Sequence, residues 1–115
     1  MHEVSLAGGI LKIVEDAAKR EHFVRVTLLR LEAGSLAGVE VRALRFALEV
    51  MAHGTCLEGA KIDITTPPGQ AWCRQCNATV TMMERGDPCE HCGNYQLEPT
   101  TGMVLQVIEI MVDDD

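Results

Sequence analysis

Residues 72–94 of the chain read WCRQCNATVTMMERGDPCEHCGN. This stretch holds two C-x2-C pairs, Cys73 with Cys76 and Cys89 with Cys92, and twelve residues separate the pairs. Each pair points two sulfur atoms at one centre, and four thiolates satisfy the tetrahedral preference of Zn2+ with no coordination position left open. The pattern therefore predicts a structural zinc ribbon, in which the metal folds the segment and takes no part in catalysis.

The residues that follow each pair support this interpretation. Asn77 and Gly93 are residue types that readily adopt positive φ, as a cysteine knuckle requires. The segment 77–88 between the pairs is long enough for a short hairpin. We considered disulfides, a redox pair and an iron–sulfur cluster as other uses of these cysteines. No secretory segment precedes them, which argues against disulfides, and a thioredoxin-like motif would occur once rather than twice.

Composition narrows the class of protein. The 115 residues suffice for one domain with a small appendage, and 47% of them are hydrophobic, although only four are aromatic. The net charge is −7, and residues 67–102 carry two positive and four negative side chains, so we expect no nucleic-acid partner. No apolar run reaches membrane-spanning length, and we expect a cytoplasmic protein.

Hydrophobic periodicity predicts two helices and three strands around the ribbon. The helices are expected at Val4–Arg20 and Val39–His53, and the strands at Val24–Glu32, Ala60–Thr66 and Met103–Val112. Both faces of the last strand are apolar, so we expect it in the interior of the sheet. The predicted fold is α+β: a three-stranded sheet with two helices, residues 1–66 and 103–115, carrying the four-cysteine zinc ribbon, residues 67–102, as an insertion.

The first residues suggest a second metal site. The α-amine of Met1, the amide nitrogen of residue 2 and the imidazole of His2 can close fused chelate rings, and such a planar nitrogen set favours Ni(II) or Cu(II). The alternative is that this histidine is incidental.

Together these features resemble the hydrogenase nickel-incorporation protein family HypA/HybF. The resemblance rests on the opening Met1-His2-Glu3, the element order, the C-x2-C-x12-C-x2-C ribbon, Gly34-Ser35 in the intervening loop and Glu40 at the start of the second helix. It implies a nickel metallochaperone without catalytic activity, which works with a GTPase to load the large subunit of [NiFe]-hydrogenase. It also implies that His2 is the principal Ni2+ ligand, beside the Met1 amine and nearby amides, with Glu3 in support and Zn2+ in the ribbon.

Several points stay open at this level. His91 is expected to face solvent, with contact to the metal as the alternative, and Cys56 is expected to be a small apolar filler. Asn94 and Tyr95 stand where some members of that family carry a further histidine, which puts a nickel ligand from the ribbon in doubt. The competing function is a zinc-ribbon assembly adaptor that binds no nickel. The sequence does not decide between a monomer and a homodimer, or whether urease is also supplied.

Overall fold

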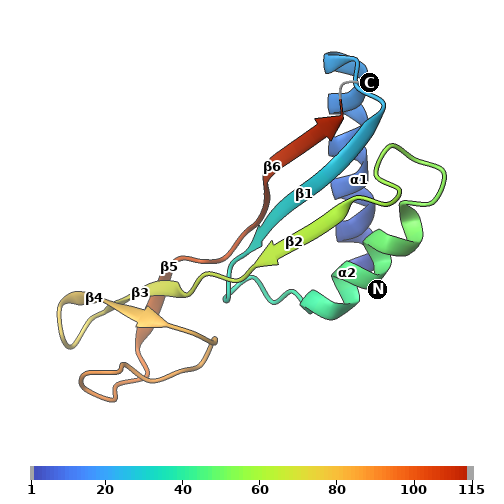
Figure 1. The fold of residues 1–115 in the computed structure, drawn as a ribbon. Coiled ribbons are helices and arrows are strands. Elements are labelled where there is room, and N and C mark those ends of the chain that lie inside the picture. Colours follow the sequence, from blue (N-terminus) through green and yellow to red (C-terminus); the bar gives the residue numbers. More distant parts are fainter. Residues whose placement is uncertain (1, 114–115) are drawn as a thin grey trace. The chain divides into compact units, whose positions relative to one another are not determined.

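A computed structural model describes residues 2–113 of the chain. Figure 1 shows its elements: α1 (His2–Glu21), β1 (Arg25–Ala33), α2 (Val41–Met51), β2 (Lys61–Thr65), β3 (Gly69–Cys73), β4 (Ala78–Met82), β5 (Leu97–Thr101) and β6 (Leu105–Asp113). They form two compact units. The first contains the residues up to Leu31, Val39–Ile64 and the residues from Val107 onward, and the second contains Glu32–Gly38 and Thr65–Gln106.

The two helices and three strands expected outside the ribbon are all present, with ends that differ by up to two residues. The shift that matters most for function is at the start of α1, which begins at His2 rather than at Val4. His2 and Glu3 therefore lie in the first turn of a helix. In the described part of the chain, neither helix combines the length and hydrophobicity that crossing a membrane requires.

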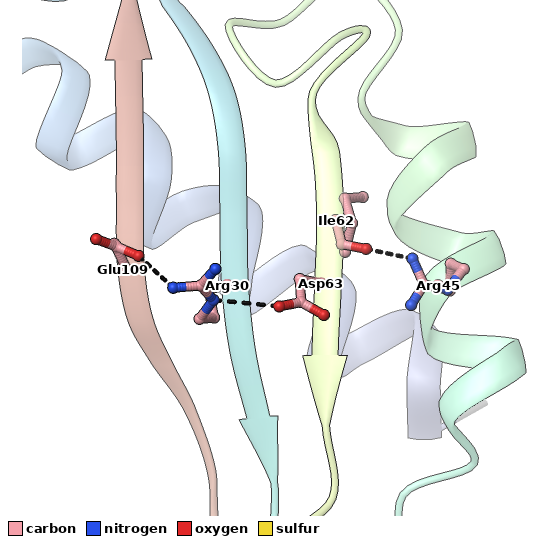
Figure 2. A network of polar contacts seen from close by, with 5 residues as sticks. All are labelled: Arg30, Arg45, Ile62, Asp63 and Glu109. Carbon is pink, nitrogen blue, oxygen red and sulfur yellow. Dashed lines mark hydrogen bonds and ion pairs between the residues drawn. The ribbon is translucent and has the colours of Figure 1, made fainter.

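The sheet of the first unit has the strand order β2-β1-β6. Figure 2 shows β1 and β2 running in the same direction and β6 running the opposite way. A parallel pair needs a crossover connection, and α2 supplies it between β1 and β2. The expectation that the last strand is interior was wrong, because β6 forms an edge and none of its residues is fully buried. Its residues are partly buried or exposed, and β1 is the central strand.

The core of the first unit lies between the sheet and the two helices, which cover the same face of the sheet (Figure 1). α1 and α2 contribute residues at helical spacing, and β1 contributes Val26 and then alternate residues from Leu29 onward. These buried side chains are Ala7, Ile10, Val14 and Ala17 from α1, Val26, Leu29 and Leu31 from β1, Leu44, Ala47 and Leu48 from α2, and Ile62 from β2.

A polar network crosses the three strands of this sheet (Figure 2). Arg30 of β1 donates to Asp63 of β2 at 3.1 Å and to Glu109 of β6 at 2.6 Å, and Arg45 of α2 donates to the carbonyl oxygen of Ile62. The side chains of Arg30, Asp63 and Glu109 are each about two-fifths exposed. Exposed ion pairs contribute about 0–1 kcal/mol each, so the network helps to hold the strands together while the apolar core supplies most of the stability.

The second unit contains the ribbon, a sheet with the strand order β4-β3-β5. β3 pairs with β4 in antiparallel register from Gly69 opposite Met82 to Cys73 opposite Ala78. The hairpin therefore turns through the first cysteine pair. It does not lie within the segment 77–88, where the sequence had suggested it, because β4 pairs with β3, the strand that ends at Cys73.

The loop between β1 and α2 packs into this second unit. Leu36 is 1% exposed and contacts Ala71, Met82 and Leu97 of the ribbon. The contact is close, since a Cβ atom added to Gly69 would lie 2.3 Å from the Cδ1 atom of Leu36. The ribbon thus completes its small core with a side chain that lies more than thirty residues before its first cysteine.

Candidate metal centres

The four ribbon cysteines converge on one point. Their Sγ atoms all lie within 4.8 Å of one another, with 3.6 Å between Cys73 and Cys92 and 3.8 Å between Cys76 and Cys89. A tetrahedral ion with Zn–S bonds of about 2.3 Å requires S···S distances of about 3.8 Å. None of these four cysteines forms a disulfide, and the arrangement fits a four-thiolate metal site.

Two equivalent knuckles create this convergence. After the first pair Asn77 has φ +55°, and after the second Gly93 has φ +76°, as the sequence predicted. The amide of Asn77 donates to the carbonyl oxygen of Cys73 at 2.8 Å, and the amide of Gly93 donates to that of Cys89 at 2.9 Å. These turns also direct amides at sulfur. Cys76 N–H donates to Cys73 Sγ at 3.4 Å, and in the second knuckle His91 N–H donates to Cys89 Sγ at 3.4 Å.

Two thiols of the cluster have pKa values shifted in opposite directions. The amide groups of Cys92 and His91 lower the pKa of Cys89 to about 6, because they stabilise its thiolate. The neighbouring sulfur of Cys92, with burial, raises the pKa of Cys76 to about 12. Cys89 is therefore the first thiol of the cluster to ionise as pH rises, whereas Cys76 retains its proton more strongly and a bound cation would favour its thiolate form.

Two further residues that the sequence raised lie outside this cluster. His91 is two-thirds exposed and sits 3.5 Å from the carboxylate of its neighbour Glu90, so it faces solvent as expected. Cys56 is half-buried in the first unit, where its carbonyl oxygen accepts from Val26 at 2.8 Å. Burial, with the nearby charge of Glu15, raises the pKa of the Cys56 thiol, which suits a packing role.

The second candidate site is at the start of α1. Met1 lies outside the described residues, so the structure places only His2 and Glu3 of the predicted nickel set. The His2 side chain is 62% exposed and the Glu3 side chain 22% exposed, and His2 Nδ1 lies 3.5 Å from Glu3 Oε2. The exposed imidazole is accessible to an ion, whereas the carboxylate is largely covered.

Glu3 makes a contact that sequence reasoning did not find. Its Oε2 atom accepts a hydrogen bond from the backbone N–H of Glu40 at 3.1 Å, 37 residues away. That bond lowers the pKa of the Glu3 carboxyl, to which its own backbone amide also contributes. Glu40 is the N-cap of α2, and its side chain accepts from the amide of Arg42 at 2.9 Å. The first turn of α1 is thus joined to the start of α2.

An apolar groove of about 300 Å³ lies beside this contact. Its most exposed apolar side chains are Val4 of α1 at 44% and Phe46 and Val50 of α2 at 70% and 52%, and Glu3 forms part of its lining. The groove was not among the sites expected from the sequence. A signal was nevertheless present, because Phe46 and Val50 are an i, i+4 apolar pair on the other side of α2 from its buried stripe.

Comparison with known proteins assigns the chain to a family. Residues 1–112 match the family described as "Hydrogenase/urease nickel incorporation, metallochaperone, hypA". The chain belongs to this family. A protein of Cupriavidus necator named "Hydrogenase maturation factor HypA" is 68% identical over 99% of this chain and 96% of its own length. A protein of Polaromonas naphthalenivorans with the same name is 60% identical over the full length of both. The resemblance inferred from the sequence is therefore confirmed.

Solved structures of the HypA family share the fold. The solution structure titled as the nickel metallochaperone HypA from Helicobacter pylori aligns with a TM-score of 0.68 over 98% of both chains at 16% identity. A second solution structure, of a HypA protein, aligns with a TM-score of 0.70 over 100% of this chain and 98% of its own at 18% identity. At these identities the likeness concerns the fold, and it confirms the predicted α+β architecture with its four-cysteine ribbon.

Proposed function

We propose that this protein carries Ni2+ at its amino terminus and delivers it, with a GTPase partner, to the large subunit of [NiFe]-hydrogenase in the cytoplasm. The observation that carries the proposal is the exposed His2 imidazole in the first turn of α1, in a chain of the HypA family. In the proposed site the imidazole is the principal ligand, and the Met1 amine with nearby amides supplies the remaining nitrogen atoms. A planar nitrogen set of this kind suits Ni(II).

The ribbon has the complementary role of a structural site. We infer that it holds Zn2+, because four thiolates at the observed separations leave no open position for water or substrate. This makes the ribbon a folded support and leaves ion transfer to the amino terminus. The domain that contains α1, α2 and the sheet β2-β1-β6 would then be the nickel-binding part of the molecule.

Substitution of His2 tests the nickel site, and His22 provides a matched control. His22 is an exposed histidine that directly follows α1. Calorimetric titration of His2→Ala with Ni2+ should show no stoichiometric binding, whereas His22→Ala should bind as the wild type does. Elemental analysis should find zinc in both variants. Unchanged nickel affinity in His2→Ala would exclude the proposed site, and a zinc content that fell with it would point to general misfolding.

The apolar groove beside Glu3 is the surface we assign to the GTPase. A partner that assists the removal of an ion from His2 must approach the start of α1, and Glu3 itself lines this groove. Phe46 and Val50 expose apolar area there that is normally buried in a protein–protein contact. A complex with the GTPase would cover them.

A pair of aromatic substitutions tests this surface. Phe46→Ala should weaken binding to the nickel-insertion GTPase and slow hydrogenase maturation, while leaving the affinities for nickel and zinc unchanged. Tyr95→Ala is the control, because Tyr95 is equally exposed at 73% but lies in the ribbon unit. Equal binding of the GTPase by both variants would refute this assignment. The competing adaptor function predicts one metal per chain after nickel exposure, instead of two.

A further inference from the structure

The start of α2 lacks one element of a complete helix cap. In a capping box the N-cap side chain bonds to an amide of the first turn, and a Glu or Gln at N3 bonds back to the N-cap N–H. Glu40 performs the first task through its contact with Arg42. The N3 position of α2 is Ala43, which has no acceptor to offer to the Glu40 N–H.

Glu3 supplies that missing acceptor from another helix. Its Oε2 atom accepts the Glu40 N–H at 3.1 Å and lies 3.5 Å from His2 Nδ1. One carboxylate oxygen therefore faces both the cap of α2 and the imidazole. The side chain is about one-fifth exposed, while the imidazole beside it is about three-fifths exposed, so the carboxylate is directed at α2 and the imidazole remains accessible.

We propose that Glu3 is a positioning residue for the nickel site, which completes the cap of α2 in place of Ala43 and so fixes the first turn of α1 that carries His2. This inference rests on the proposed function. It assigns the Glu3 side chain to the support of the site and excludes its carboxylate from the ligands of nickel. Groups that orient a metal ligand through a hydrogen bond contribute to affinity without touching the ion.

Two substitutions of Glu3 separate a hydrogen-bond acceptor from a ligand. Glu3→Gln keeps an oxygen that can accept the Glu40 N–H but removes the charge, and it should bind nickel close to the wild-type affinity. Glu3→Ala removes the acceptor, and its affinity should fall about 10- to 100-fold. Amide hydrogen exchange gives an independent readout, because protection of the Glu40 N–H should persist in Glu3→Gln and be lost in Glu3→Ala.

A third variant separates positioning from simple stabilisation of the helix. Ala43 is partly exposed, and Ala43→Glu would give α2 its own capping box. In the double variant Glu3→Ala/Ala43→Glu, protection of the Glu40 amide and the midpoint of thermal unfolding should return toward wild type. Nickel affinity should stay as weak as in Glu3→Ala, since the first turn of α1 still has no hydrogen bond to the start of α2.

Two results would overturn the inference. If Glu3→Gln binds nickel as weakly as Glu3→Ala, the charged carboxylate itself acts on the ion. If the double variant regains nickel affinity, Glu3 only caps a helix. Failure of the proposed nickel site would be recognised separately, because His2→Ala would then bind nickel with wild-type affinity.

Discussion

Substitution of Leu36 by alanine should weaken metal binding at cysteines that are far from it in sequence. Leu36 belongs to the loop between β1 and α2, yet it is 1% exposed and packs on Ala71, Met82 and Leu97 in the ribbon. Metal binding and folding of a zinc ribbon are one process, since the ligand set does not exist in the unfolded segment. A loss of packing in the folded ribbon must therefore appear as a loss of zinc affinity.

The size of the effect follows from the packing around Leu36. Replacing a fully buried leucine by alanine costs about 2–5 kcal/mol, depending on how far the surroundings can collapse into the cavity. Here one wall of that cavity is backbone, because Leu36 lies directly against Gly69, and backbone in a paired strand cannot move inward. A cost of about 3 kcal/mol corresponds to a decrease in zinc affinity of about two orders of magnitude.

Competition against a chromogenic chelator at fixed pH measures this affinity, and Leu44→Ala is the matched control. Leu44 is also fully buried, but it belongs to α2 in the first unit. Its substitution should lower the thermal stability of the first unit by a similar free energy and leave the zinc affinity unchanged. The reasoning fails if Leu36→Ala retains wild-type zinc affinity, or if Leu44→Ala lowers that affinity as strongly.

Three further predictions concern backbone space, pH and the amino terminus. Gly9→Ala should stabilise α1 by about 1 kcal/mol, because an added Cβ atom meets nothing within 4 Å. Gly34→Ala should lower the midpoint of thermal unfolding strongly, because its Cβ atom would lie 2.2 Å from the carbonyl oxygen of Gly102. Zinc affinity should fall as pH decreases, and the fall should become steeper by one proton per zinc below about pH 6. Backbone amides lower the pKa of Cys89 to about 6, so below that pH zinc must also displace the proton of this thiol. A constant slope through pH 6 would contradict this. One residue added before Met1 should preserve nickel binding but impair hydrogenase maturation, and three added residues should weaken nickel binding. Nickel titration and a maturation assay measure the two effects. Equal behaviour of the wild type and both extended proteins would remove the amino terminus from the mechanism.

Local patterns predicted the elements of the fold well and their neighbours less well. The cysteine spacing and the positive φ of Asn77 and Gly93 are properties of a few adjacent residues, so the sequence contains them directly. The edge position of β6 depends on pairing with β1, and its apolar residues gave the opposite signal. Leu36 looked like an ordinary loop residue, because its packing partners come from strands that begin more than thirty residues later.

The candidate nickel site shows the same limit. The proposed ligands follow from the sequence alone, because amine, amide and imidazole nitrogen atoms are consecutive in Met1-His2. The contact between Glu3 and Glu40 spans 37 residues, and no local pattern predicts it. One clue was present in the sequence: Ala43 leaves the cap of α2 without its usual partner three residues after the N-cap. Such a gap indicates that an acceptor comes from elsewhere, although it does not identify which residue supplies it.

The two proposed metal sites differ in a way that suits their roles. The ribbon would hold its ion with four sulfur atoms, two of them buried, and on this proposal release of the ion is coupled to unfolding of the segment. The amino terminus offers three nitrogen atoms in sequence, and a fourth ligand must come from the Glu3 amide, water or a recipient protein. An ion held with one exchangeable position can pass to a new ligand before it leaves the old ones, without any unfolding. On this argument the anchoring of Glu3 to α2 keeps the exposed imidazole in place while its ion is transferred.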